Sequence, residues 1–326
     1  MTIARLSEVK SDGVVFTSGA TEANALALLG AVRAAKSERR HVLYHAAQHA
    51  SVIGAMELLK EEGVAVEPLD LSDIKAQLRP ETVLVTLDAV NSETGERFDT
   101  LAVRRVLDAY RKEGGAHILL HVDASQAPHA LPYTLAHLGA DMVSLDAQKV
   151  GGVRGIGALL MRHGIALAPL VRGGGQEGGK RPGTENPALA FSFAAALTEA
   201  NEQREKFVDR SERMRRRLVE KIAAIQRTVV NEGLENVSHI LNVSFLGRDT
   251  DYLVALLDRD GFAVSTKSAC ESNEVGSRAV RAQGGDEERA TSTLRISWGP
   301  ATREQDLDRF ADVLMRNVRF LDEKAL

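Results

Sequence analysis

The chain has 326 residues, of which 44% are hydrophobic and 26% are charged, which is ordinary for a globular enzyme and long enough for two domains. Its net charge of −4 gives no indication of nucleic-acid binding, its apolar runs fall short of the roughly 18 residues that span a membrane, and its N-terminus has no apolar signal core. The single cysteine, Cys270, excludes an internal disulfide and fits a reducing compartment, so we expect a cytoplasmic protein.

Short apolar runs alternate with helical patterns through the first half of the chain. The expected strands are 13–17, 41–44, 64–67, 83–87, 118–122, 142–145 and 158–161. The expected helices are 22–37, 52–62, 100–113 and 133–138. This alternation predicts an α/β fold, with a mostly parallel sheet and helices on both of its faces. Ligands of such sheets bind at the carboxyl ends of the strands, where Thr17, Tyr44 and Asp123 lie.

The second half of the chain has a different organisation. A long helical pattern runs from 186 to about 225, apolar at first and then rich in charge. It is followed by expected strands 240–245, 262–265 and 294–297 and by expected helices 251–260 and 304–326. We place a boundary inside the long helix, which divides the chain into a large domain, 1–205, and a smaller α+β domain, 206–326.

Lys149 and Asp123 are the first candidates for chemistry. An apolar stretch carries Lys149 into a glycine-rich turn, 26 residues after the apparently buried Asp123. Desolvation at the end of such a stretch would lower the pKa of a lysine, so that its neutral amine could form a Schiff base. An acid on a neighbouring strand could keep a pyridinium nitrogen protonated, and together the two residues suggest pyridoxal phosphate (PLP) chemistry. For Lys149 alone, a surface lysine is the simpler interpretation.

Two further segments are compatible with a cofactor. The segment 16–24 runs through Gly19 into a helix, where free N–H groups can bind phosphate, although an ordinary helix cap is the alternative. His45 and His49 have the i, i+4 spacing of a zinc site, but no glutamate accompanies them and no third ligand is evident, so no metal site is expected. One of these rings could stack on a cofactor, or both could bond to backbone.

Two loops complete the candidates. The glycine-rich stretch 173–186, with Lys180 and Arg181, could wrap an anion or a neighbouring subunit, or be a mobile surface loop. Cys270 follows an expected strand in a polar segment, so we expect an exposed thiol whose pKa a nearby cation, Lys267 or Arg295, could lower. Arg295 also suits the capture of a substrate carboxylate. A chance loop cysteine and a surface arginine are the alternatives.

Taken together, six blocks occur in one order: Phe-Thr-Ser-Gly-Ala-Thr-Glu, His-Val-Asp-Ala-Ser-Gln, Gly-Ile-Gly-Ala-Leu, Gly-Gly-Gly-Gln-Glu, Arg-Pro-Gly-Thr-Glu-Asn and Ser-Ala-Cys. In this order they resemble the cysteine desulfurases, in the class V aminotransferase group of PLP enzymes. The resemblance extends from Val14 to about Leu314 and implies PLP fold type I. It further implies a homodimer that converts L-cysteine to L-alanine and passes the sulfur to an acceptor protein, such as an iron–sulfur scaffold.

The resemblance also implies roles for individual residues. Lys149 carries the Schiff base, His49 stacks on the ring, and Cys270 receives the sulfur. The ring nitrogen pairs with Asp123, and its phenolic oxygen bonds to Gln126. The residues implied to hold the phosphate are Ala20, Thr21 and Gln148, together with Thr184 of the second subunit. The residues implied at the substrate are Arg295, which grips the carboxylate, and also Asn91 and Ser92.

The chain departs from the family pattern in three places. Asp146-Ala-Gln148-Lys149 replaces the usual Ser-Gly-His-Lys, and a carboxylate at Asp146 should repel phosphate unless a cation or water intervenes. Ser92 stands where the family has an asparagine. The family has several dozen residues before the first block, so the chain resembles a truncated or minimal form, or one that a partner completes. Another class V PLP enzyme, such as an aminotransferase or selenocysteine lyase, and a non-catalytic paralogue remain alternatives.

Overall fold

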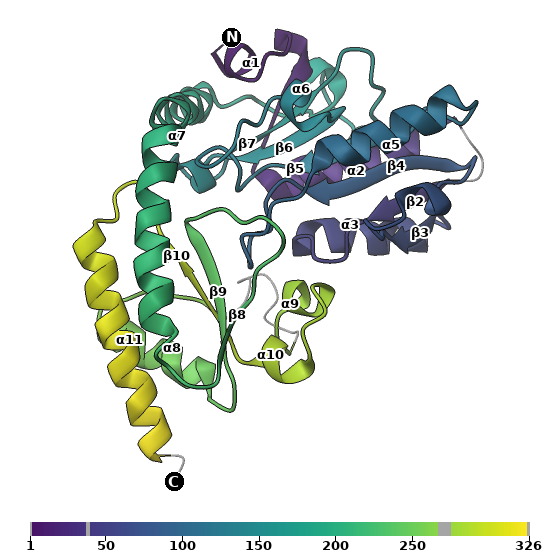
Figure 1. Ribbon diagram of the computed structural model, residues 1–326. Helices are drawn as coiled ribbons and strands as arrows, with labels where there is room; N and C mark the ends of the chain where they lie inside the picture. Colours follow the sequence, from purple (N-terminus) through teal and green to yellow (C-terminus); the bar gives the residue numbers. More distant parts are fainter. Residues whose placement is uncertain (1, 37–39, 267–274, 325–326) are drawn as a thin grey trace. The chain divides into compact units, whose positions relative to one another are not determined.

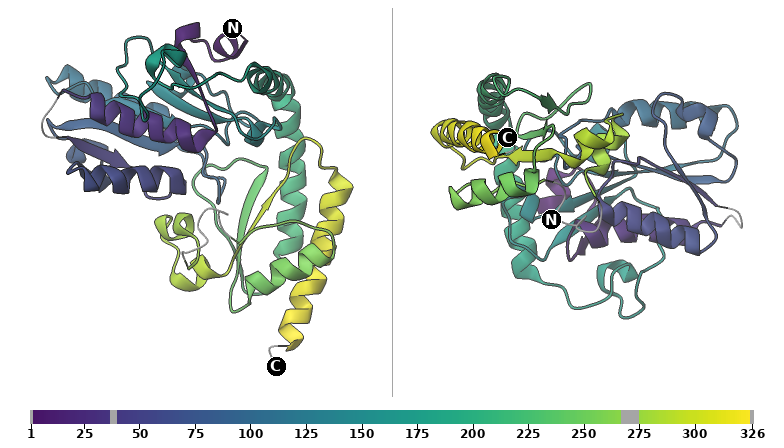
Figure 2. Two further views of the ribbon diagram at one scale, coloured as in Figure 1. Left: turned by 180° about the vertical axis from the view of Figure 1, so that it is seen from behind. Right: turned by 90° about the horizontal axis from the view of Figure 1, so that it is seen from below.

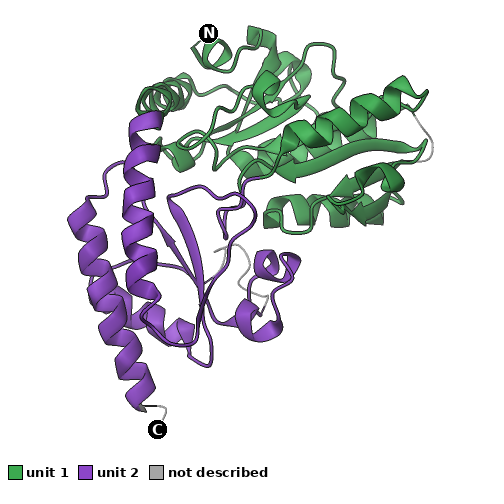
Figure 3. Cartoon of the chain, in the orientation of Figure 1, with its two compact units in different colours: residues 1–90, 98–204 green, residues 91–97, 205–326 purple. Residues whose placement is uncertain are grey.

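The computed structural model describes residues 2–36, 40–266 and 275–324. The chain divides into two compact units (Figure 3): unit 1 comprises residues 1–90 and 98–204, and unit 2 comprises residues 91–97 and 205–326. The division after residue 204 falls inside the long helix α7 (Pro187–Ile222). The short segment 91–97 belongs to unit 2, although the sequence analysis placed it in the first domain.

Unit 1 is built on a seven-stranded sheet with the order β1-β7-β6-β5-β4-β2-β3 (Figure 1). Its strands are β1 (Val14–Thr17), β2 (His41–Tyr44), β3 (Ala65–Pro68), β4 (Thr82–Asp88), β5 (Leu119–Asp123), β6 (Met142–Asp146) and β7 (Gly157–Met161). Strands β2 to β6 are parallel, and β7 runs antiparallel to both of its neighbours. The predicted mostly parallel α/β sheet is therefore confirmed.

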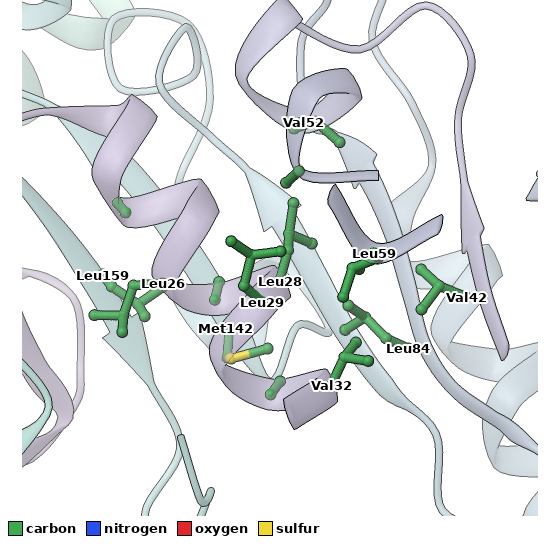
Figure 4. Close-up of a cluster of buried hydrophobic side chains, with 14 of the residues drawn as sticks. Leu26, Leu28, Leu29, Val32, Val42, Val52, Leu59, Leu84, Met142 and Leu159 are labelled. Carbon is green, nitrogen blue, oxygen red and sulfur yellow. The ribbon is translucent and has the colours of Figure 1, made fainter. Parts of the chain in front are cut away.

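Helices cover the sheet because its strands are apolar on both sides. The helices of unit 1, besides the first part of α7, are α1 (Thr2–Leu6), α2 (Ala20–Ala34), α3 (Ala50–Glu61), α4 (Ile74–Gln77), α5 (Thr100–Lys112) and α6 (Leu135–Leu138). The two opposite views show α2 and α5 on opposite faces of the sheet (Figures 1 and 2). Leu26, Leu28 and Val32 of α2 are buried among side chains of α3 and the sheet, including Leu84 and Leu159 (Figure 4). This core fixes α2, whose first turn lies at the candidate site.

Unit 2 has a three-stranded antiparallel sheet in the order β10-β9-β8. Its elements are β8 (Thr228–Val230), β9 (Ile240–Phe245), α8 (Thr250–Arg259), α9 (Arg278–Ala282), α10 (Glu287–Thr291), β10 (Thr293–Ser297) and α11 (Glu304–Lys324). The second part of α7 lies beside α11 (Figures 1 and 2), and ion pairs such as Arg217–Asp308 link the two helices. Phe207, Phe245 and Phe310 share one buried core beneath them.

One expected strand is wrong. Residues 262–265 form no strand, and only Ser265 makes an isolated antiparallel bridge, to Arg295 of β10. Phe262 and Val264 pack against the core of unit 2, so the apolar residues that suggested a strand are accounted for by packing, without a hydrogen-bonded ladder.

Candidate active site

The candidate site begins on one face of the unit 1 sheet, at the carboxyl ends of its strands. Alternate residues of a strand point to the same face, and the register pairs Asp88 of β4 with Asp123 of β5. Asp146 ends the next strand, β6, two residues beyond Ser144, the register partner of Asp123. Three strand ends therefore place a carboxylate on the face that α2 covers.

Asp123 is held by hydrogen bonds on both of its oxygens. Its Oδ1 accepts the backbone N–H of Ser125 at 2.9 Å and the Ser125 hydroxyl at 2.6 Å. Its Oδ2 accepts Nδ2 of Asn24, in α2, at 2.7 Å. Because the carboxylate is only 8% exposed, these donors offset much of the cost of its burial. The result is a fixed acid at the end of β5.

The same network continues to His49. Asn24 Nδ2 also donates to Ser51 Oγ at 2.9 Å, and Ser51 Oγ lies 2.9 Å from His49 Nδ1. His49 caps α3, because its Nδ1 accepts the Ser51 N–H at 3.2 Å. Asn24 and Ser51 therefore connect the predicted ring-stacking histidine to the predicted partner of the ring nitrogen, Asp123. Gln126 lies half-buried on the turn after β5.

A buried histidine lies on the same face, two residues before Asp123. His121 Nδ1 is 2.9 Å from the Thr86 hydroxyl, and its Nε2 is 2.9 Å from the Ser144 hydroxyl. Burial lowers the pKa of His121 to about 4, and the charge of Asp123 opposes this only in part. The ring is therefore neutral at neutral pH, and a single proton suffices for its two hydroxyl partners.

The first turn of α2 approaches the sheet closely. A side chain at Gly157 would bring its Cβ within 2.8 Å of the Gly19 Cα, so β7 can pass the start of α2 only with glycine there. Asp146 Oδ2 accepts the Ala20 N–H at 3.0 Å, and Asp146 Oδ1 accepts the Gln148 N–H at 3.0 Å. The predicted phosphate donor Ala20 is thus bonded to a carboxylate 126 residues away in the chain.

Lys149 lies in the 3₁₀ turn η2 (Gln148–Val150), directly after β6. The structure places it and Gln148 on the surface of the single chain, whereas the sequence analysis expected desolvation of Lys149. The apolar stretch ends at Leu145 and Ala147, which are fully buried, and the chain then turns outward. Thr21 is likewise exposed.

The glycine-rich loop is tied to the segment that leads into α2. Glu177 Oε2 accepts the Phe16 N–H at 3.2 Å, and Arg181 pairs with Glu22 of α2 at 2.9 Å. Burial alone would raise the pKa of Glu22, but Arg181 and the Ser18 N–H lower it on balance. The loop is anchored at these two points, and Thr184 beyond them is exposed.

The predicted substrate residues lie in unit 2. Arg295 of β10 donates from Nη1 to the Ser92 carbonyl at 3.1 Å. Asn91 Oδ1 accepts the N–H groups of Glu93 and Thr94 at 2.9 and 3.0 Å, so it stabilises the turn that presents this carbonyl. Burial lowers the pKa of Arg295, while the charge of Glu93 raises it. Cys270 lies outside the described residues.

His45 has the surroundings of a core residue. Its ring packs against Phe98 at a centroid distance of 4.5 Å and an interplanar angle of 59°. Burial lowers its pKa to about 4. No group of three or more metal-ligating side chains occurs within the ranges that the structure describes, and none of their helices combines the length and apolar character needed to cross a bilayer.

A cavity of about 660 Å³ lies elsewhere in unit 1. It is lined by residues at the starts of β4 and β5 and by Arg104, Arg111, Asp141 and Arg162. None of the predicted site residues lines it, because parallel strands begin at one edge of the sheet and end at the other. The candidate site therefore rests on the carboxyl ends of the strands.

Sequence reasoning did not find Asn24, Ser51 or His121. Asn24 is fully buried inside a helix whose neighbouring positions are alanine and leucine. A polar residue in an otherwise apolar helical stretch is costly to bury without a partner, and this signal is readable in the sequence. The partner itself, 99 residues away, is not.

Comparison with known proteins gives the chain a family. Residues 1–310 match the sequence model of the family described as aminotransferase class-V. Cysteine desulfurase IscS 1 of Archaeoglobus fulgidus is 33% identical over 325 residues, which cover 95% of this chain and 83% of that protein. Cysteine desulfurase IscS of Vibrio campbellii is 36% identical over 318 residues, which cover 94% of this chain and 77% of that protein.

Solved structures agree. A NifS-like protein has a TM-score of 0.89 and 28% identity, covering 98% of this chain and 86% of its own. A structure described as SspA in complex with cysteine has a TM-score of 0.75 and 29% identity, covering 93% of this chain and 86% of its own. The predicted PLP fold type I and the cofactor, PLP, are thereby confirmed. This chain belongs to the cysteine desulfurases of the class V aminotransferase family.

Proposed function

We propose that this chain acts on L-cysteine, leaving L-alanine as one product and a persulfide on Cys270 as the other. The observation that carries the proposal is Asp123 at the end of β5, whose two carboxylate oxygens both accept hydrogen bonds. Asn24 and Ser51 link this carboxylate by hydrogen bonds to His49. Donors on both oxygens hold the carboxylate in one orientation. This suits a protonated ring nitrogen, whose single N–H points in one direction and needs an acceptor placed there. Family membership supplies the reaction class.

PLP, when bound, would supply an electron sink for chemistry at the Cα of the substrate. Lys149 is the residue we assign to bind it covalently and, once freed, to remove the Cα proton of cysteine with its amine. The surface position of Lys149 in the single chain leaves this amine accessible both to PLP and to cysteine. His49, capping α3, offers an imidazole face for the ring, and Gln126 an amide for its phenolic oxygen.

Arg295 is the residue we assign to bind the substrate carboxylate. One guanidinium nitrogen is oriented by the Ser92 carbonyl, and the other N–H groups retain the planar fork that suits a carboxylate. Asn91 and Ser92 then act on the substrate through Arg295: the Asn91 side chain holds the turn, and the Ser92 carbonyl fixes the guanidinium.

The sulfur transfer balances with Cys270 as the acceptor. The Cys270 thiolate attacks the sulfur of the substrate, so that an S–S bond forms and the C–S bond breaks. The electron pair of the broken bond stays on carbon, which takes up a proton and becomes the methyl group of alanine. Cys270 is the only thiol in the chain, so no other residue can carry an enzyme persulfide.

The partners we propose are a second copy of this chain and a sulfur-accepting protein. The loop that ends at Thr184 is glycine-rich and largely exposed, though anchored through Glu177 and Arg181. Burying it against a symmetric neighbour would bring the Thr184 hydroxyl to the other subunit's phosphate. An iron–sulfur scaffold is the proposed acceptor, because related proteins carry the name IscS. We further propose a cytoplasmic location, in keeping with the single thiol.

Two measurements on one preparation test the proposal. Purified protein should absorb at the violet edge of the visible and lose that band on borohydride reduction, with the label found on Lys149 by peptide mass spectrometry. It should also release one alanine per sulfur taken from cysteine in the presence of a reductant. Cys270→Ser should keep the band and its change on cysteine addition but lose sulfide and alanine production.

Other outcomes separate the alternatives. A colourless protein that takes up no added PLP refutes the assignment. Parent-level turnover by Cys270→Ser identifies a lyase that eliminates sulfide directly. A protein that holds PLP but turns over neither cysteine nor selenocysteine is an aminotransferase if it transfers the amino group of another amino acid to a keto acid, and the non-catalytic paralogue if it does not.

A further inference from the structure

Asp146 occupies a position where its charge opposes the proposed cofactor. Its Oδ2 accepts the Ala20 N–H at 3.0 Å and would lie 3.3 Å from a Cβ on Gly19. Ala20 begins α2, whose cap residue, Gly19, has no side chain to offer. Asp146 therefore performs from β6 the capping that a local Ser, Thr or Asp performs in other helices.

The position of Asp146 is fixed rather than incidental. Its Oδ1 accepts the Gln148 N–H at 3.0 Å, and Asp146 pairs with Gly157 in the β6–β7 ladder. Gly157 in turn packs against Gly19 at less than ordinary side-chain distance. Both oxygens and the backbone are thus engaged, and a rotation of the carboxylate away from α2 would break at least one of these contacts.

A phosphate group would compete for the same N–H. The free N–H groups and the dipole of a helix N-terminus are what attract phosphate, and here a carboxylate already satisfies one of them. Two further carboxylates take the alternate N–H groups just upstream: Glu177 accepts from Phe16 and Glu22 accepts from Ser18. Arg181 pairs with Glu22, whereas no cation is paired with Asp146 among the ion pairs of the described residues.

We propose that Asp146 sets the affinity for the phosphate group of the cofactor, so that this chain holds PLP mainly through Lys149 and discriminates weakly between PLP and pyridoxal. The inference rests on the proposed function, because it takes the phosphate to lie at the start of α2. Asp146 is then a residue that determines cofactor specificity. Its removal should tighten binding of the phosphorylated form alone.

The test measures binding rather than turnover. The full chain, stripped of cofactor, is titrated with PLP and with pyridoxal while the absorbance of the Lys149 adduct is followed. For Asp146→Ser and for the nearly isosteric Asp146→Asn, we expect the Kd for PLP to fall by about tenfold, which corresponds to roughly 1.4 kcal/mol. The Kd for pyridoxal should stay within about twofold of the parent value, since pyridoxal has no phosphate to repel.

Asp99→Asn is the matched control. Asp99 is the local cap of α5 and accepts the Ala102 N–H at 2.8 Å, so its substitution removes an equal charge from a helix start outside the site. It should leave both Kd values unchanged. If Asp146→Ser and Asp146→Asn bind PLP no more tightly than the parent, or gain equally for pyridoxal, the proposal is refuted.

A second probe keeps this test independent of PLP chemistry. Inorganic phosphate should raise the Tm of the Asp146 variants more than that of the parent or of Asp99→Asn. If no protein forms a Lys149 adduct, the proposed function fails while the phosphate result still decides the role of Asp146. If the adduct forms but the variants and the parent respond alike to phosphate, the role of Asp146 fails alone.

Discussion

The buried His121 should make unit 1 sensitive to acid in a specific pH range. Its pKa is about 4 in the folded chain, against an ordinary value of 6.5, because it is fully buried. The folded state therefore binds fewer protons than the unfolded state between these values, and stability must fall as the pH falls through 6.5 towards 4. Well above pH 6.5 the ring is neutral in both states and contributes no pH dependence.

The magnitude follows from the two pKa values. The full difference corresponds to roughly 3 kcal/mol below pH 4, at about 1.36 kcal/mol per pKa unit. Between pH 7 and pH 5 the contribution of His121 is about 2 kcal/mol. His121→Gln keeps one hydrogen-bonding amide between Thr86 and Ser144 but cannot be protonated, so it should remove this part of the acid sensitivity.

Urea unfolding at pH 7 and pH 5 measures the effect. Circular dichroism is the suitable signal, because the single tryptophan, Trp298, lies in unit 2. The free energy of unfolding of the parent should fall between these pH values by about 2 kcal/mol more than that of His121→Gln. His137→Gln, at an exposed histidine of α6, should behave as the parent. If the parent and His121→Gln lose equal stability on acidification, the claim that the buried His121 ring is neutral and makes unit 1 acid-sensitive is refuted.

Two further substitutions probe the site. Thr184→Ala should weaken PLP retention on gel filtration without changing the circular dichroism, and a strictly monomeric protein with full cofactor occupancy would contradict the shared site. Asn24→Leu keeps the volume of the side chain but leaves Asp123 Oδ2 without the hydrogen-bond donor from α2. The free energy of unfolding should therefore fall by about 2 kcal/mol, and the absorbance band of bound PLP should shift. Asn201→Leu, an exposed asparagine of α7, is its control, and equal spectra for the two variants would exclude a link from Asn24 to the ring.

The strands of unit 1 were readable from sequence because both faces of the sheet are covered. Buried parallel strands consist of apolar runs such as those of β4 and β6, and the predicted ranges agree with the observed ones to within one or two residues. Strand β8 (Thr228–Val230) was missed, since three half-buried residues give no periodic signal. Helices α9 and α10 have five residues each and depend on their caps, Ser277 and Asp286, rather than on an apolar stripe.

The site was only partly readable. The motif order identified Lys149, Asp123 and Arg295 as candidates, and the structure describes their surroundings without testing their roles. The partners that fix them come from distant parts of the chain: Asn24 reaches Asp123 across 99 residues and Ser92 reaches Arg295 across 203. No local pattern encodes such pairs, because they depend on strand order and on the packing of α2. Likewise, sequence flagged Asp146 as a departure but could not show that it caps α2.

The carboxylates that bond to residues 16–20 give Asp146 a structural role, although it departs from the family pattern. Strand β1 is at the edge of the sheet and, among the strands of the described residues, pairs with β7 alone, so the Phe16 N–H on its outer side needs an acceptor that none of those strands supplies. Glu177, Glu22 and Asp146 accept from Phe16, Ser18 and Ala20 in turn. They hold the entrance to α2 in one conformation, which is what a cofactor site requires of it. Asp146→Ser should therefore lower the Tm of the cofactor-free chain even as it tightens PLP binding, because the residue that opposes the phosphate also holds the helix that receives it.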